Sequence, residues 1–174
     1  MTPSYYGLYI SSCYGRVEVL DRSKSAVLYC AEVQPCKPQL YIYRPLIEMH
    51  CDEILALATF HRFSSAITIQ IYDGEHLNMC RKSLLSGTHT FRVAGLKWSW
   101  RRDGIMKGNL KLINEESNRA IATFHQTSSW SGKMLGIFAV FGMHRSPIVD
   151  AVIVTGLAKL GYQWLAQSID VEPR

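Results

Sequence analysis

The chain has 174 residues, of which 48% are hydrophobic and 19% charged, with a formal net charge of +5 at pH 7. This length and composition suit one domain with a sizeable core and exclude an intrinsically disordered chain. The mild basic excess suits acidic lipids or nucleic acid, but it is equally typical of a soluble cationic protein. No low-complexity run or linker divides the sequence, so we expect a single domain over residues 1–174.

The N-terminal stretch MTPSYYGLYISSCYG lacks the basic segment followed by an apolar segment that marks a secretory leader. The five cysteines are odd in number and irregularly spaced, which favours free thiols in a reducing compartment. We therefore expect an intracellular, cytoplasmic protein.

Alternating apolar and polar residues dominate the chain up to residue 141. Segments such as LYIYR and ITIQIYD follow the period of two that is typical of strands, and turn signals such as Asp73-Gly74 separate them. We predict about twelve short antiparallel strands at 5–11, 15–20, 25–33, 39–44, 53–61, 66–73, 76–82, 88–94, 96–102, 108–114, 118–126 and 132–141.

The pattern then changes to one long helix, predicted over residues 147–166. Ser146 suits the N-cap, Pro147 the first helical position, and Asp150 the first turn, where the helix dipole favours a negative charge. Apolar residues occupy all sides of this helix, so it must be surrounded by protein or by lipid.

A membrane span is the less favoured of these two solutions. Asp150, Lys159 and Gln163 interrupt the apolar run, whereas a span needs roughly twenty consecutive apolar residues. A sheet of about twelve strands can instead close into a barrel around the helix, which also removes exposed strand edges. The predicted fold is therefore a closed, mainly β barrel that encloses a hydrophobic C-terminal helix, and the protein is not expected to be transmembrane.

A ten-residue internal repeat supports this architecture. The segment ALATFHRFSS at 56–65 returns as AIATFHQTSS at 120–129. Alternation gives each strand an Ala-x-Ala-x-Phe stripe on one face, so we predict two related halves that press Ala58 and Ala122 against the central helix. As a chemical alternative, His61 and His125 could form a matched pair of metal ligands or acid–base groups; alternation places both on the opposite face, which disfavours this.

Residues with catalytic or metal-binding chemistry are scattered and lack a recognised spacing. Met49-His50-Cys51-Asp52-Glu53 is a row of potential ligands, but adjacent residues of an extended chain point in alternate directions. Cys30 and Cys36 could approach each other across a turn without a second pair to complete a site. No G-x-S-x-G and no glycine-rich phosphate loop occurs, so we expect no metal, no cofactor and no catalytic set. The alternative that stays open is an accidental cluster of Ser, His and Asp side chains.

The hairpin over residues 96–111 is the strongest candidate site. Alternation places Leu96, Trp98 and Trp100 on one face and Lys97, Ser99 and Arg101 on the other. The two tryptophans are expected in the core or barrel wall rather than in a base-stacking platform. We predict an anion- or lipid-contacting surface, with a solvated hairpin face as the alternative. Its candidate residues are Lys97, Arg101, Arg102, Lys107 and Lys111.

Three segments resemble a known family. GTHTFRVAGLKWSWRRDG, NLKLINEESNRAIATFH and IVDAVIVTGLAKL are similar to the fungal tubby C-terminal-like domains of unknown function. The matching features are Lys97-Trp98-Ser99-Trp100, the Leu110–Phe124 hairpin and the helix segment Asp150–Leu157. The likeness covers residues 88–160 well and the N-terminal half loosely.

The resemblance implies the tubby fold, a closed twelve-stranded barrel threaded by a hydrophobic helix. Wider relatives include phosphoinositide-binding tubby proteins, phospholipid scramblases and plant LURP-one-related proteins, but no phosphoinositide motif matches here residue by residue. We therefore expect a non-catalytic module that binds anionic phospholipids or a protein partner. The alternatives are a small-molecule-binding protein, a cryptic enzyme with a pocket on the barrel, and a regulator that contacts nucleic acid, which charge alone supports. The oligomeric state does not follow from the sequence.

Overall fold

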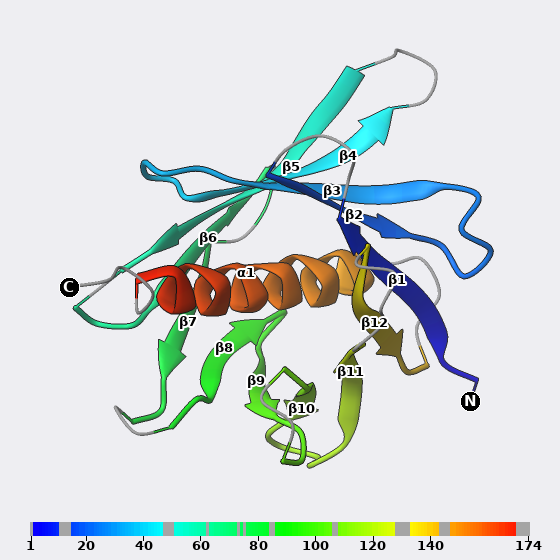
Figure 1. Cartoon of the computed structure of the whole chain (residues 1–174). Coiled ribbons are helices and arrows are strands. Elements are labelled where there is room, and N and C mark those ends of the chain that lie inside the picture. Colours follow the sequence, from blue (N-terminus) through cyan, green and yellow to red (C-terminus); the bar gives the residue numbers. More distant parts are fainter. Residues whose placement is uncertain are drawn as a thin grey trace.

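The computed structural model describes residues 2–10, 15–46, 51–61, 63–72, 74, 76–83, 86–105, 108–127, 133–142 and 147–169. These residues form twelve strands followed by one helix (Figure 1). The strands are β1 (Ser4–Ile10), β2 (Arg16–Leu20), β3 (Val27–Val33), β4 (Leu40–Leu46), β5 (Cys51–Phe60), β6 (Ile67–Ile71), β7 (His76–Arg81), β8 (His89–Val93), β9 (Leu96–Arg102), β10 (Leu110–Asn114), β11 (Ala120–Gln126) and β12 (Met134–Val140). The helix is α1 (Pro147–Ile169).

The strands form a closed antiparallel barrel, as the sequence pattern predicts. Each strand pairs with its neighbours in sequence, and β1 pairs with β12 to close the sheet, with Ser4 opposite Val140. Closure therefore gives each of the twelve described strands a neighbouring strand on both sides.

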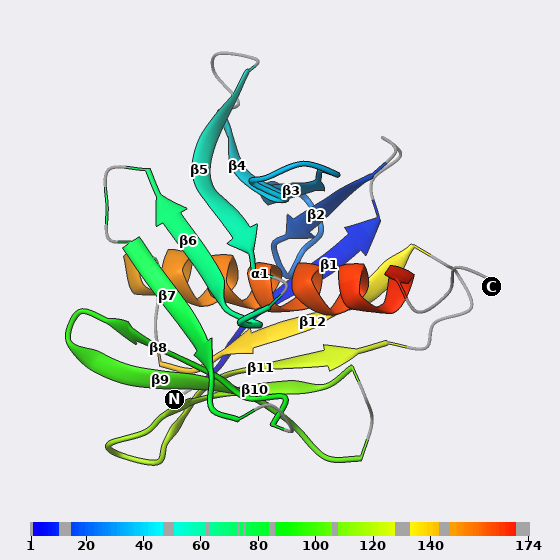
Figure 2. The same ribbon diagram turned by 90° about the vertical axis from the view of Figure 1, so that its left-hand side faces the viewer.

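The helix lies along the interior of this barrel, between its walls (Figures 1 and 2). Every residue from Ala151 to Gly161 is buried, and the segment packs against β4, β5, β6, β8 and β12. By length and composition Pro147–Ala166 is apolar enough to cross a membrane, but most of it is buried inside the chain's own barrel. Protein therefore covers its apolar circumference, as predicted. The predicted N-cap, Ser146, lies outside the described residues.

Close contact between helix and wall depends on a small residue and a hydrogen bond. A Cβ added at Gly156 would lie only 2.7 Å from Cε1 of Phe138 and 3.2 Å from Cζ2 of Trp100. One residue earlier, the Thr155 hydroxyl accepts a hydrogen bond from Trp100 Nε1 at 3.0 Å. The indole is thus satisfied in the core, and α1 is held at a defined depth against β9.

The two strands that carry the repeated segment, β5 and β11, occupy opposite sides of the barrel. In the closed strand order β5 and β11 are six positions apart. Ala58 and Ala122 are both fully buried in the core, with Phe60 and Phe124 beside them. The inward positions of Ala58 with Phe60 and of Ala122 with Phe124 are therefore confirmed. Ala120, the first alanine of the second stripe, is only half-buried, and a register shift separates it from Ala122. The relation between the two halves stays a prediction. Ser128 and Ser129, which complete the second copy, lie outside the described residues.

Turns alternate between the two ends of the barrel because every strand pair is antiparallel. The ring of Phe60, at the end of β5, contacts the ring of Tyr162 with centroids 5.8 Å apart. Gly87, before β8, accepts a hydrogen bond from Lys159. Strands β5, β7, β9 and β11 therefore end where α1 ends, as Figure 2 shows for β9 and β11. We call this end the C-terminal rim, and the end at which α1 begins the N-terminal rim.

The buried helix predicts a sharp contrast between two substitutions on α1. Val152→Asp places a carboxylate where the side chain is fully buried, and an unpaired buried charge costs several kcal/mol. We expect this variant to yield no soluble folded protein. Ala166→Asp, at an exposed position of the same helix, should keep the wild-type circular dichroism spectrum and melting temperature. A soluble Val152→Asp protein with a native spectrum would contradict a core built around α1.

The alanine stripes predict overpacking. Ala58→Leu and Ala122→Leu each add volume at a fully buried position, and each should lower the free energy of unfolding by about 1–3 kcal/mol in urea melts. Ala120→Leu, at a half-exposed position of β11, is the matched control and should change it little. Two neutral results at Ala58 and Ala122 would mean that the stripes face outward.

Candidate functional site

The candidate hairpin is formed by β9 and β10, which pair with Arg101 opposite Lys111. Trp98 and Trp100 point inward and are buried, so the expectation that they belong to the core is confirmed. The cations on the alternate positions therefore lie on the outer wall, but they differ in what surrounds them.

Lys97 and Lys111 are the two predicted cations that lie on the outer wall without an ion-pair partner among the described residues. Lys97 is exposed and lines a shallow groove of about 360 Å³ on the outside of β7, β8 and β9. The other groove residues are His76, Asn78, Thr90, Phe91 and Arg92.

Arg101 is already engaged by an internal carboxylate. Its Nη2 lies 2.6 Å from Oε1 of Glu115, and its Nε donates a hydrogen bond to the hydroxyl of Ser99 at 3.0 Å. Hydrogen bonds from Ser99 and from Arg101 lower the pKa of Glu115 to about 2, so this carboxylate stays ionised at neutral pH. Arg101 therefore stabilises the outer wall, where it helps to cover Ser99, rather than offering a free guanidinium to an external anion.

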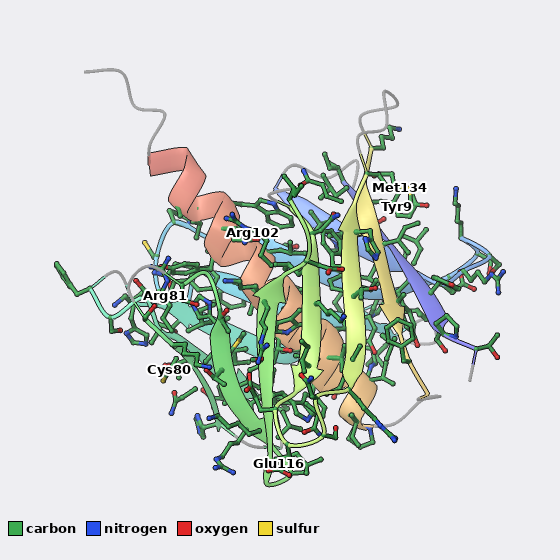
Figure 3. All side chains as sticks on the ribbon, turned by 90° about the horizontal axis from the view of Figure 1, so that it is seen from below. Tyr9, Cys80, Arg81, Arg102, Glu116 and Met134 are labelled. Carbon is green, nitrogen blue, oxygen red and sulfur yellow. The ribbon has the colours of Figure 1, made fainter. Side chains whose placement is uncertain are left out.

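Arg102 projects to the other face of the strand. It follows Trp100 by two residues, so alternation directs it to the inner side, and because β9 ends there it emerges exposed at the C-terminal rim. Figure 3 shows Arg102 beside the final turns of α1. Lys107, the remaining predicted cation, lies outside the described residues. The structure thus divides the predicted set into Lys97 and Lys111 on the wall, Arg101 in an ion pair, and Arg102 at the rim.

The sequence analysis missed a polar cluster inside the barrel. Lys159 of α1 is 2% exposed, and its Nζ donates to the Gly87 carbonyl at 2.7 Å and lies 2.7 Å from Nδ1 of His89. Nε2 of His89 in turn lies 2.9 Å from the Ser65 carbonyl. Arg81 binds the same loops, through the Ser86 carbonyl and the Ser65 hydroxyl.

Burial and neighbouring cations suppress the charge of this cluster. Burial, together with Arg81 and Arg102, lowers the pKa of Lys159 to about 8. Burial and the Lys159 charge lower the pKa of His89 to about 4. At neutral pH His89 is therefore neutral, so its Nδ1 can accept a hydrogen bond from the Lys159 ammonium group while its Nε2–H donates to the Ser65 carbonyl.

A lysine with a lowered pKa is sometimes a nucleophile, but Lys159 is enclosed. Its ammonium group is directed to a loop carbonyl and a histidine, and its side chain is almost fully covered. The arrangement fastens the β7–β8 turn to α1, and we assign it a structural role.

Three further ion pairs stabilise the barrel. Asp150, in the first turn of α1, accepts from the Tyr29 hydroxyl and from Arg44 Nη2, both at 2.7 Å. Arg16 pairs with Asp52 at 2.9 Å and with Glu32 at 3.4 Å. Asp150 therefore anchors the helix start to β3 and β4, beyond its expected effect on the helix dipole.

The residues considered for metal chemistry do not converge. His61 lies 2.9 Å from the Thr68 hydroxyl, and it is six strands from His125 around the barrel. Cys30 and Cys36 are free thiols. Within the part of the chain that the structure describes, no group of three or more His, Cys, Asp or Glu side chains could hold a metal ion. His50, Asp73 and Glu75 lie outside that part.

Comparisons with protein-family models, with curated proteins and with solved structures find no match to this chain.

The buried cluster predicts a pH-dependent stability. Lys159 has a lower pKa in the folded state than in the unfolded state, so the unfolded state binds more protons between about pH 8 and the usual lysine value. Stability should therefore rise with pH across this window, and the His89 shift should remove stability as pH falls from about 6.5 to 4.

Urea melts of wild type and Lys159→Met at pH 8 and pH 10 measure the first of these effects. We expect the free energy of unfolding of wild type, relative to that of Lys159→Met, to be larger at pH 10 than at pH 8. An identical pH dependence in both proteins would show that Lys159 titrates normally in the folded state.

Proposed function

We propose that the protein is a non-catalytic binding module that attaches peripherally to membranes through anionic phospholipid headgroups. The observation that carries this proposal is the uneven distribution of charge. The described residues between 76 and 126 include eight cations but only three carboxylates. The cations are Arg81, Lys82, Arg92, Lys97, Arg101, Arg102, Lys111 and Arg119, and the carboxylates are Asp103, Glu115 and Glu116.

Only some of these cations are available to an external anion. Arg101 is paired with Glu115, and Arg81 holds loop carbonyl and hydroxyl groups. Lys82, Lys97 and Arg102 are exposed, and Lys111 is half-buried. Each cation near an anionic bilayer contributes about 1 kcal/mol, so a group of this size supports weak adhesion that falls as salt increases.

The filled interior favours binding on the outside of the barrel. The helix occupies the space in which barrels of similar size hold ligands, and the cavity beside its last turns measures about 80 Å³. Lys159, the buried group with the most reactive chemistry, is enclosed. A ligand would therefore meet the outer wall or the rims, where contacts with charged headgroups need no catalytic set.

The resemblance to fungal tubby C-terminal-like domains adds support of a different kind. It rests on the segments that contain Lys97-Trp98-Ser99-Trp100 and Asp150–Leu157, and its better-known relatives include phosphoinositide-binding proteins. Membership of that family is part of the proposal, because a shared architecture alone does not carry function.

Charge reversal tests this proposal. Wild-type protein should sediment with vesicles of phosphatidylcholine and phosphatidylserine at low salt and should stay in solution with phosphatidylcholine alone. The double variant Arg102→Glu/Lys111→Glu should lose most of this binding, because it reverses two cations that have no ion-pair partner among the described residues. Arg101 is left intact because its reversal would place a carboxylate beside Glu115 and destabilise the wall.

The melting temperature of the double variant is the control for folding and should stay near that of wild type. Failure of the wild-type protein to sediment with anionic vesicles at low salt would refute the lipid proposal.

A further inference from the structure

The C-terminal rim carries an ordered arrangement of exposed residues. Five of its turns are described at their tips or flanks, and around the barrel these alternate between cation and apolar residue. In order they present Lys37 after β3, Phe63 after β5, Lys82 after β7, Ile105 after β9 and Lys133 before β12.

Hydrogen bonds and a shared small cavity join these turns to one another and to the end of α1. Gln39 exchanges hydrogen bonds with the backbone of Phe60, which links the β3–β4 turn to the end of β5. The Lys133 carbonyl accepts from the amide of Ile10 at the end of β1. Gly108 and Gln126 line one small cavity with Trp164 of α1. The five turns therefore belong to one continuous rim.

The two apolar residues are exposed without any packing of their own. Phe63 and Ile105 are 103% and 100% exposed, well above Tyr72 at 63%, the next large hydrophobic residue in the described chain. Their full apolar surface faces water, and transfer of that surface to an apolar phase is favourable. They sit on separate turns with a cationic turn between them, so they cannot shield each other.

Charge differs between the two ends of the barrel. The C-terminal rim presents Lys37, Lys82, Arg102 and Lys133 as exposed cations, with Asp103 as the carboxylate among its described turn residues. The N-terminal rim mixes both signs more evenly. Asp21, Glu115, Glu116 and Asp150 lie there with Arg22, Lys24 and Arg119, and Arg92 and Lys97 flank its β8–β9 turn. Figure 3 shows this polarity, with Arg102 toward the end of α1 and Glu116 at the opposite end.

We propose that the C-terminal rim is the surface that docks on an anionic bilayer, with Phe63 and Ile105 inserted at the boundary of headgroups and acyl chains and the flanking cations on the headgroups. Cations beside exposed apolar side chains are the combination that interfacial membrane binding requires. The bilayer is the occupant that matches both properties, because it supplies negative charge and an apolar layer a few ångströms beneath it. The inference rests on the proposed lipid binding and adds its orientation and its apolar component.

Hydrogen bonds hold one flank of the turn between the two insertion sites. Arg81 donates to the Ser86 carbonyl at 2.8 Å, and Lys159 donates to the adjacent carbonyl of Gly87 at 2.7 Å. The buried cluster thus holds Ser86 and Gly87, on the β8 side of the β7–β8 turn, against Arg81 and α1. Backbone held in this way loses little conformational entropy on binding, which favours docking at this part of the rim.

The test compares tip variants with a matched control in vesicle sedimentation. Phe63→Ala and Ile105→Ala should each weaken partitioning to phosphatidylcholine/phosphatidylserine vesicles by about tenfold, as expected for the loss of one buried large apolar side chain. Tyr72→Ala removes an exposed aromatic residue from the opposite end and should bind like wild type. Salt screens the cations but not an inserted apolar side chain, so wild type should keep some binding at high salt. The double variant Phe63→Ala/Ile105→Ala should lose this residual binding.

Insertion itself is measured with brominated lipids. The added fluorescence of Phe63→Trp should be quenched by brominated acyl chains, and that of Tyr72→Trp should not. Wild-type binding that persists unchanged in both tip variants, or equal quenching at positions 63 and 72, would overturn docking through this rim and leave lipid binding in place. Absence of wild-type binding to anionic vesicles would instead refute the proposed function and this inference together.

Discussion

The structure depends on one constraint, which is that a helix with apolar residues on every side must be covered on every side. The chain meets this demand with its own strands. A flat sheet would cover one face of α1, whereas twelve strands closed by the β1–β12 pair surround it. Glycine at position 156 then lets the helix lie close to Phe138 and Trp100 of the wall.

The same constraint directs function to the surface. A filled barrel leaves little interior volume, so the polar groups that remain inside serve the architecture. Lys159 and His89 illustrate this, because they are buried, share a hydrogen bond and hold a turn that faces solvent. The cations and exposed apolar residues that are free to meet a partner lie on the outer wall and on the C-terminal rim, which is where the two proposals place the contact.

Much of the fold could be predicted from the sequence because its signals are local. Period-two alternation located the strands, and the uniform apolar helix implied its own enclosure. The candidate site was less predictable, because it depends on which side chains the strand register and the packing of the helix bring together. The contact of Arg101 with Glu115 depends on the β9–β10 register, and that of Lys159 with His89 joins residues 70 positions apart. Lys159 was visible only as a charge that interrupts the apolar run, and Arg102 could be assigned to the rim only once the end of β9 was known.

Native-state hydrogen exchange of the helix amides tests the central claim most directly. If α1 is the core around which the barrel closes, it cannot be exposed until the barrel opens. The amides from Val152 to Leu160 should then exchange only through global unfolding, with the same free energy and the same urea dependence as the whole protein. Exchange of these amides through a local opening of clearly lower free energy, while the strands stay protected, would contradict this account.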